Sequence, residues 1–389
     1  MKFLAPRSLI NLFALLLATA SGWPAPTLAA PGAAVQVMYL ANKNVITTYN
    51  VDPNSGEMNQ VGQPLTIQSA QYLTSISSVP DGKFIYVLWI DAGNRFHVSG
   101  YITDSRGIPN RSTFQTLSST RLHGFEVDPD GRFAYALESW VDNQGEMKSN
   151  LRLFTIDSST GKLTKSKQIQ AHYGPDYYYS AALNGFNSSG SKLYDVWSFN
   201  FDHESAAVYS YHPVNSNTGA LKPDVTIFQT SDYDSSDNVS ISGKLLAQIF
   251  SACCDAWVNV YKNPPQTQNG QYVPLIHCTS SMLPQCATAE RAILDPSSSN
   301  LFMPPLSNGD TAIAHIDLTN SMLKQTGTIP GFVQVIFSSN PGLIYAANWG
   351  YQSDSAITTY LFDANAGTVT QGGQLVVEAQ SLYASRRMQ

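Results

Sequence analysis

The sequence predicts an all-β fold, a seven-bladed β-propeller of four-stranded antiparallel blades, from two repeated turn patterns and their spacing. The first pattern is a strand, a turn rich in Pro, Asp, Gly or Ser, and a second strand. Its clearest copies lie at residues 76–86, 125–135 and 183–194, with weaker ones at 293–302 and 336–345. Repetition near fifty residues is typical of propellers, because a small sheet buries its faces only by packing on its neighbours.

The second pattern is an alternating strand that ends in a turn with Gly or Asn. Its seven copies fall at intervals of 51, 54, 58, 51, 50 and 47 residues, at Gly56, Gly107, Gly161, Gly219, Gly270, Asn320 and Gly367. Gly accepts the positive φ of such a turn at no steric cost. Each interval holds four strands and no amphipathic helix, and the alternative is a linear β protein of two domains.

The first copy of the repeat lacks its leading strand, because nothing before Met38 supplies one. The segment 379–387 is the candidate replacement. We therefore expect the two ends of a single domain, residues 36–389, to pair and close the ring.

Charge is sparse along the chain. Its 389 residues include 22 Lys and Arg against 28 Asp and Glu, for a net charge of −6. This balance argues against a nucleic-acid surface and against a polybasic membrane anchor.

The first thirty residues are typical of an export signal. Lys2 and Arg7 precede an apolar run over residues 9–18, and small residues follow. This run is too short to span a bilayer, and no later stretch approaches 18 apolar residues. We expect residues 1–30 to direct a secreted or periplasmic protein without a membrane span.

Four cysteines lie close together in the sequence: Cys253, Cys254, Cys278 and Cys286. Export places them in an oxidising compartment, which favours two disulfides. Their spacing lacks the paired C-x-x-C of zinc sites. Three pairings remain open, including a bridge between the adjacent residues.

His123 begins the inner strand of the third blade, and Glu138 lies late in its partner. If residues 130 and 131 form a two-residue turn, residue 129 pairs with residue 132, and every further pair has numbers that sum to 261. Residues 123 and 138 are such a pair. Their Cβ atoms would then lie ~5 Å apart. A carboxylate beside an imidazole suits acid or base catalysis near neutral pH, although a structural histidine is the plainer interpretation.

The repeat resembles the lactonase-type seven-bladed propeller family, which includes 6-phosphogluconolactonases and carboxymuconate cycloisomerases. The resemblance covers residues 36–378, and its most specific parts are the Pro-Asp-Gly and Thr-Gly turns and the segment 122–131. It implies that His123 transfers a proton and that Glu138 orients it. The family places these residues where loops surround the propeller axis.

Other expected residues of the cycloisomerases are missing. Where these enzymes carry a Pro-Arg pair and a Glu, the chain has Tyr179 with Ser180 and, later, Ser198. Losing a cation that would dock a substrate carboxylate removes about 1.5–3 kcal/mol. Arg291 or Arg121 are the candidate replacements, with a charge at the rim as the plainer interpretation of each.

The aromatic run Tyr177, Tyr178 and Tyr179 precedes the fourth inner strand and, with Ser198, is the candidate ligand-binding surface. The sequence has no H-E-x-x-H, Walker or G-x-S-x-G motif, so we expect neither metal nor cofactor.

Two functions therefore compete. The first is an exported, monomeric lactonase (a hydrolase) or cycloisomerase-like enzyme acting on a small lactone, organic acid or sugar derivative. The second is a non-catalytic propeller that binds a ligand or protein outside the cytoplasm, since fold alone does not establish function.

Overall fold

The computed structural model describes most of the chain from residue 36 onward. The described residues are 36–112, 117–119, 122–141, 143, 147–170, 178–187, 189–201, 204–229, 238–242, 244–252, 255–268, 271–289, 292–305, 309–331, 334–338, 342–348, 355–377 and 381–387. The predicted export signal and the pair Cys253 and Cys254 lie outside them. Within the described residues, no helix has the length and apolar character needed to cross a bilayer.

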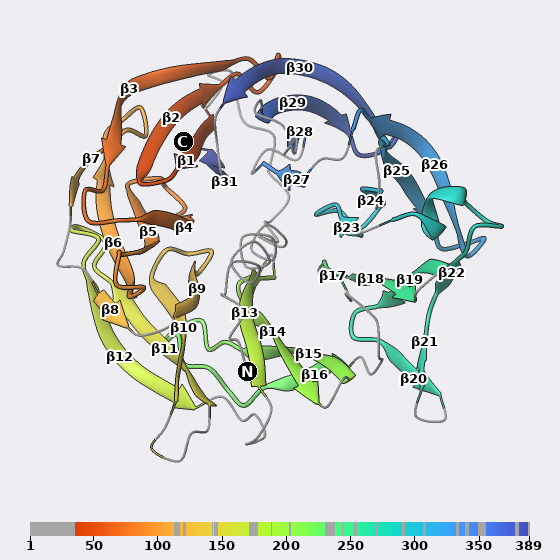
Figure 1. Ribbon diagram of the computed structural model, residues 1–389, viewed down its shortest axis with the longest axis horizontal. Coiled ribbons are helices and arrows are strands. Elements are labelled where there is room, and N and C mark those ends of the chain that lie inside the picture. The colour runs from red at the N-terminus through yellow and green to blue at the C-terminus, as the bar shows by residue number, and fades with distance from the viewer. Residues whose placement is uncertain are drawn as a thin grey trace, which may run out of the picture.

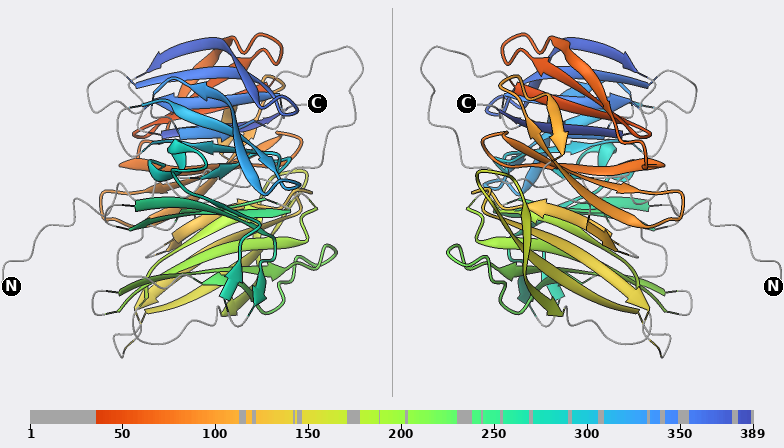
Figure 2. Two further views of the ribbon diagram at one scale, coloured as in Figure 1. Left: turned by 90° about the vertical axis from the view of Figure 1, so that its right-hand side faces the viewer. Right: turned by 90° about the vertical axis from the view of Figure 1, so that its left-hand side faces the viewer.

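Seven small antiparallel sheets stand around a common axis, which confirms the predicted seven-bladed propeller (Figure 1). Six of these sheets have four strands, and the second has a fifth. The strands run between the two flat faces of the ring (Figure 2), so the turns gather on these faces.

The first four blades follow the chain in order. Blade 1 contains β1 (Gln36–Asn42), β2 (Val45–Val51), β3 (Met58–Thr66) and β31 (Ser381–Arg387). Blade 2 contains β4 (Tyr72–Ser78), β5 (Phe84–Ile90), β6 (Phe96–Thr103), β7 (Pro109–Ser112) and β8 (Leu117–Ser119). Blade 3 contains β9 (Leu122–Val127), β10 (Phe133–Val141), β11 (Met147–Ile156) and β12 (Leu163–Gln170). Blade 4 contains β13 (Tyr178–Phe186), β14 (Lys192–Phe201), β15 (Glu204–Pro213) and β16 (Val225–Gln229).

The last three blades complete the ring. Blade 5 contains β17 (Asn238–Ile241), β18 (Leu245–Ala252), β19 (Asp255–Lys262) and β22 (Ile276–Cys278). Blade 6 contains β23 (Ile293–Leu294), β24 (Asn300–Met303), β25 (Thr311–Asp317) and β26 (Met322–Ile329). Blade 7 contains β27 (Gln334–Phe337), β28 (Leu343–Asn348), β29 (Ser355–Asp363) and β30 (Thr368–Val377).

The core lies between the blades. Each of seven apolar clusters joins residues of two neighbouring blades, one cluster for every junction in the ring. Strand β5 shows why its sequence is continuously apolar: Tyr86 and Leu88 face blade 3, whereas Ile85 and Val87 face blade 1. Successive side chains of a strand point to opposite faces, so a second strand must be apolar on both.

The C-terminal strand closes the ring, as the sequence predicted. Residues Met38 to Ala41 of β1 pair antiparallel with Ser381 to Ala384 of β31. The sheet order β3-β2-β1-β31 makes β31 the innermost strand of blade 1. The strand that the first repeat lacks is therefore supplied by the other end of the domain.

A tyrosine hydroxyl ties each of the first three blades to the next. Tyr86 donates to the carbonyl oxygen of Gly161 at 2.9 Å, and Tyr135 donates to that of Gly219 at 2.7 Å. Gly161 has a φ of +70°, and a Cβ there would lie 2.5 Å from the ring of Phe84. The turn glycine of one blade thus fits against the Phe-x-Tyr segment of the blade before it.

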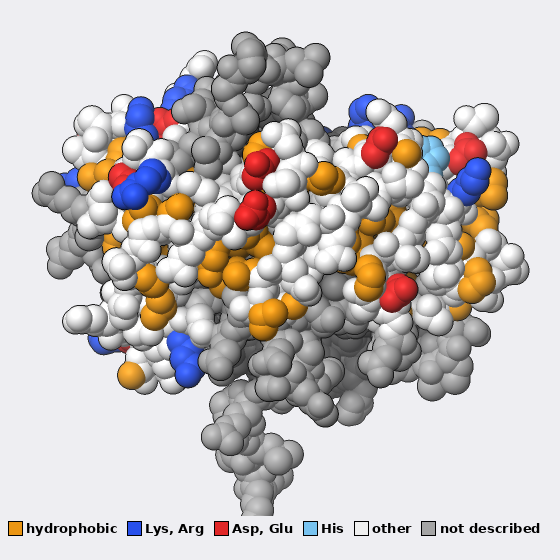
Figure 3. All heavy atoms as spheres, turned by 90° about the horizontal axis from the view of Figure 1, so that it is seen from above, with side chains coloured by type: hydrophobic (Ala, Val, Ile, Leu, Met, Phe, Trp, Pro, Cys, Tyr) orange, Lys and Arg blue, Asp and Glu red, His pale blue; other side chains and the backbone are white. Residues whose placement is uncertain are grey.

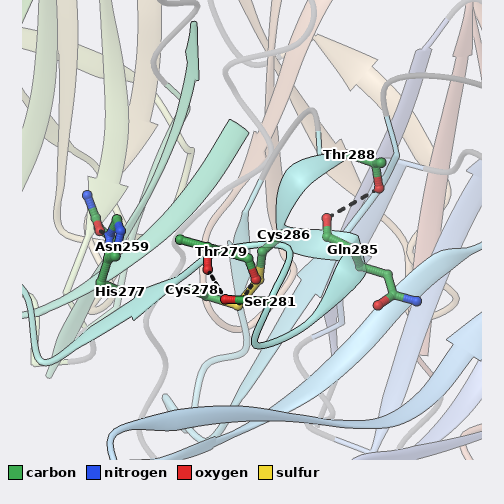
Figure 4. The surroundings of a disulfide bond; sticks show 8 residues. All are labelled: Asn259, His277, Cys278, Thr279, Ser281, Gln285, Cys286 and Thr288. Carbon is green, nitrogen blue, oxygen red and sulfur yellow. Dashed lines mark hydrogen bonds between the residues drawn. A yellow bond between two sulfur atoms is a disulfide. The ribbon is translucent and has the colours of Figure 1, made fainter. Parts of the chain in front are cut away.

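Blade 5 departs from the regular repeat. The turn expected near Gly270 belongs instead to an added hairpin of β20 (Gln266–Gln268) and β21 (Gln271–Val273), and β22 serves as the fourth strand. A disulfide joins Cys278 at the end of β22 to Cys286 in the short 3-10 helix Pro284–Ala287 (Figure 4). This bond confirms one of the predicted disulfides.

Candidate functional site

The predicted site lies where inner strand β9 begins and β10 ends. Because the two strands are antiparallel, Leu122 and Glu138 lie at the same face of the ring. His123 belongs to β9, and its side chain is outside the described part of the structure.

The predicted pairing of His123 with Glu138 is wrong by one residue. Four pairs from Val127 with Ala134 to Gly124 with Leu137 keep the expected register, and Glu138 then lies opposite Leu122. His123 is the extra residue of a β-bulge. Such a bulge inserts one residue and bends the strand, which changes the direction of the side chains around it.

Glu138 has a partner that the sequence did not suggest. Its carboxylate forms an ion pair with the guanidinium of Arg152 on β11, and both strands belong to blade 3. Glu138 is buried and Arg152 is mostly buried, so little water screens the pair. In the register of β10 with β11, Arg152 lies diagonally across from Glu138, close enough for long side chains to meet.

The second predicted group, in blade 4, is brought to one end of two strands. Tyr178 and Tyr179 lie at the start of β13, and Ser198 lies in β14 opposite Ser180. The backbone thus places both candidate ligand-binding segments side by side. Their side chains, and the whole of Tyr177, Arg121 and Arg291, are outside the described part of the structure.

Glu126 is a carboxyl on an inner strand that the sequence analysis did not select. It lies in β9 opposite Tyr135, on the face that turns toward blade 4. Burial raises the pKa of Glu126 to about 8, so the group is mostly protonated at neutral pH. A charged residue between Phe125 and Val127, in a strand closest to the axis, was the signal that could have identified it.

A histidine and an aspartate are buried together between blades 3 and 4. His212 Nε2 lies 3.1 Å from Asp195 Oδ2, and His212 Nδ1 lies 3.2 Å from the carbonyl oxygen of Lys222. Both neighbours accept hydrogen bonds, which requires protons on both ring nitrogens. Burial acts to lower the pKa of His212, but the hydrogen bond and charge of Asp195 raise it overall. At 1% and 0% exposed, neither residue can reach a ligand.

A second pair of a histidine with an aspartate, His97 with Asp91, stabilises the turn after β5. Asp91 accepts hydrogen bonds from His97 Nε2 at 3.0 Å and from Arg95 Nε at 2.8 Å, and it also accepts two backbone N–H groups. The bond from the Arg95 backbone N–H, together with that from His97, lowers the pKa of Asp91. His97 stacks on Trp89 with ring centres 4.2 Å apart. These contacts satisfy the carboxylate within its own hairpin.

Comparison with known proteins identifies the fold. The chain matches no protein-family model and no curated protein sequence. It is similar to a provisionally assigned 6-phosphogluconolactonase from Bacteroides uniformis, with 15% identity, coverage of 89% of this chain and 97% of that chain, and a TM-score of 0.57. It is also similar to the periplasmic gluconolactonase of Pseudomonas aeruginosa, with 12% identity, coverage of 91% and 99%, and a TM-score of 0.57.

A hypothetical selenium-binding protein from Sulfolobus tokodaii is similar as well, with 11% identity, coverage of 94% of both chains and a TM-score of 0.51. The chain therefore has a lactonase-type propeller fold. Proteins of different names share this fold, so the chemistry must be argued from the site.

Proposed function

We propose that the chain is an exported lactonase or cycloisomerase-like enzyme that acts on a small lactone, organic acid or sugar derivative without a metal or cofactor. His123 transfers the proton, and Glu138 with Arg152 forms the charged group beside it. The observation that supports this function best is the bulge at His123, which lies next to a buried carboxylate–guanidinium pair on a lactonase-type fold. β-Bulges are common beside active sites, where they redirect a side chain.

The roles follow from the chemistry of ring opening. A lactone carbonyl gains negative charge on its oxygen as water attacks, and the attacking water must lose a proton. An imidazole accepts that proton near neutral pH, and a cation stabilises the developing oxyanion. Arg152 is the described cation nearest to Glu138, while Arg121 and Arg291 remain candidates for the same role.

Three further features belong to this proposal. The predicted export signal and the disulfide of Cys278 with Cys286 favour a secreted or periplasmic, oxidising location. Acidic and basic side chains are few and scattered on the face drawn in Figure 3, which favours a small-molecule ligand over nucleic acid. We also expect the protein to be a monomer.

The experiment that tests the function is hydrolysis of glucono-δ-lactone by the full chain. His123→Ala should lower kcat/KM by about 10²–10⁴-fold, the usual contribution of a general acid or base. His277→Ala is the matched control, since His277 is exposed on outer strand β22. Equal rates for the wild type and His123→Ala, with unchanged melting curves, would remove catalysis from this position.

One observation favours the second candidate, a non-catalytic binding propeller. The carboxylate of Glu138 already has Arg152 as an ion partner, and it lies out of register with His123. A module of this kind would bind lactones, sugars or aromatic acids in a thermal-shift screen and would turn over none of them. Turnover that depends on His123 excludes it.

A further inference from the structure

The innermost strands of the blades carry few charged side chains among those that the structure describes, and the side chains of Arg386 and Arg387 at the end of β31 lie outside that part. Sheet order and Figure 1 place seven strands nearest the axis: β4, β9, β13, β17, β23, β27 and β31. Among their side chains that the structure describes, Glu126 is the only carboxyl, and none carries an amine or guanidinium. A single acid in this position requires an explanation.

The surroundings of Glu126 are apolar and tightly packed. Its cross-strand neighbour Tyr135 packs edge to face on Phe186, with ring centres 5.4 Å apart. Two residues earlier, a Cβ added to Gly124 would lie 3.0 Å from the Leu183 side chain, so β9 and β13 approach closely there. Little water can therefore surround the carboxyl on this side.

No hydrogen bond or ion pair joins the Glu126 side chain to another residue of the described structure. A purely structural role does not explain this arrangement, because buried acids in native proteins are nearly always paired. Asp195 in the same blade junction follows that rule with His212. An unpaired acid lowers stability, and such groups are concentrated at binding and active sites.

Glu126 is nevertheless not fully enclosed. It is partly exposed, unlike its neighbour Phe125, which is 1% exposed. Strand β9 ends its sheet in the order β12-β11-β10-β9, so its outer edge pairs with no strand of blade 3 and turns toward the axis. Glu126 therefore combines partial exposure with a position on the innermost strand of blade 3.

We propose that Glu126 is a neutral hydrogen-bond donor that binds the carboxylate of a small organic acid at the propeller axis. The inference deepens the proposed function and rests on it for the size of the ligand. A protonated carboxyl donates to a carboxylate in a charge-assisted bond, which is about twice as strong as a neutral one. Once ionised, the same group repels the ligand. The raised pKa of Glu126, about 8, supplies the neutral form at physiological pH.

Binding should therefore depend on pH in a defined direction. Only the protonated form binds, so the affinity for the anion should stay constant below pH 8 and fall about tenfold for each further pH unit. Glu126→Gln keeps a neutral donor and should bind with no such fall. Glu126→Leu removes the donor and should weaken binding at least tenfold at pH 7.

The experiment is calorimetric titration of the full chain with gluconate and with cis,cis-muconate, from pH 6 to pH 10. Infrared difference spectra of wild type against Glu126→Gln report the protonated carboxyl directly. A carboxyl that is ionised at pH 6, the same affinity in Glu126→Leu and wild type, or no binding of either acid would overturn the inference.

The outcome is separable from that of the proposed function. Lactone hydrolysis that depends on His123, with acid binding independent of Glu126, rejects the inference and keeps the enzyme. Acid binding that depends on Glu126, with no lactone hydrolysis, keeps the binding site and rejects the enzyme.

Discussion

The junction between blades 3 and 4 and the junction between blades 7 and 1 use the same repeat but treat their buried polar groups differently. In the first, Tyr135 donates to Gly219. In the second, Thr359 Oγ1 donates to the carbonyl oxygen of Gly56 instead, and the buried hydroxyl of Tyr345 has no hydrogen-bond partner in the described structure. The two tyrosine hydroxyls are therefore similarly buried but contribute differently to the free energy of unfolding. A buried polar group is costly when it has no hydrogen-bond partner.

The largest expected effect comes from the unpaired acid of the first junction. The folded-state pKa of Glu126 is raised from 4.5 to about 8, so folding favours the protonated form. Below pH 4.5 the carboxyl is protonated in both states and does not affect the free energy of unfolding. As the pH rises from 4.5 to 8 the folded state keeps a proton that the unfolded state loses, so the fold becomes less stable, and above pH 8 the loss levels off. At pH 8 the loss is roughly 4 kcal/mol, because each tenfold change in a protonation equilibrium corresponds to about 1.4 kcal/mol.

Glu126→Gln should remove this dependence. Urea unfolding of wild type and variant should give similar free energies at pH 4.5, and the variant should be the more stable at pH 8. A difference in free energy between wild type and Glu126→Gln that is the same at both pH values would contradict the prediction, because it would show that Glu126 ionises alike in the folded and unfolded states.

The next effect concerns the paired groups of the same junction. His212→Ala leaves Asp195 buried without its cation and should lower the free energy of unfolding by about 3 kcal/mol at pH 6. His97→Ala is the matched control. Asp91 keeps Arg95 and two backbone N–H groups, so this change should cost less. An equal loss of unfolding free energy in His212→Ala and His97→Ala would contradict this prediction, because it would show that the remaining partners of the aspartate do not matter.

The pH dependence of the His212 pair has a definite sign. Because the folded-state pKa of His212 is raised, its contribution is complete below the unfolded value of 6.5 and is lost as the pH rises through the folded value. The difference in stability between wild type and His212→Ala should therefore shrink at alkaline pH. Denaturant melts at pH 6 and pH 9 measure it.

The smallest effect compares the two tyrosines directly. Tyr135→Phe removes a hydroxyl that donates to Gly219 and should cost about 1 kcal/mol, since the carbonyl loses its donor. Tyr345→Phe removes a hydroxyl without a partner and should be neutral or slightly stabilising. Thermal unfolding of both variants, side by side, tests the comparison, and a larger loss for Tyr345→Phe would reverse it.

The sequence predicted the architecture because periodicity carries it. A regular pattern repeats along the chain in the turn glycines and in the apolar second strands. The first repeat breaks it, because its leading strand is missing, and the pairing of β1 with β31 was predicted from that gap. The register of β9 with β10 was also correct until the bulge. A bulge adds one residue without altering which residues are apolar, so the pattern did not reveal it.

The site was less predictable because it depends on contacts across strands and blades. Arg152 stands between Leu151 and Leu153, a pattern typical of a strand with one face in solvent. In a propeller both faces of this strand lie near a neighbouring blade. Arg152 is therefore mostly buried, and it meets Glu138 on the adjacent strand of its own blade. The position of Glu126 between Phe125 and Val127 marks it as unusual, but its raised pKa depends on burial by the neighbouring blade, which the sequence around it does not describe.

The closure of blade 1 has a consequence for biosynthesis. Residues 36–42 leave the ribosome early, yet their inner partner is made more than three hundred residues later. Until then β1 exposes an unsatisfied edge that can capture other strands. A chaperone that covers this edge, or export in an extended state, would limit such capture, because the ring cannot close before its last strand is made.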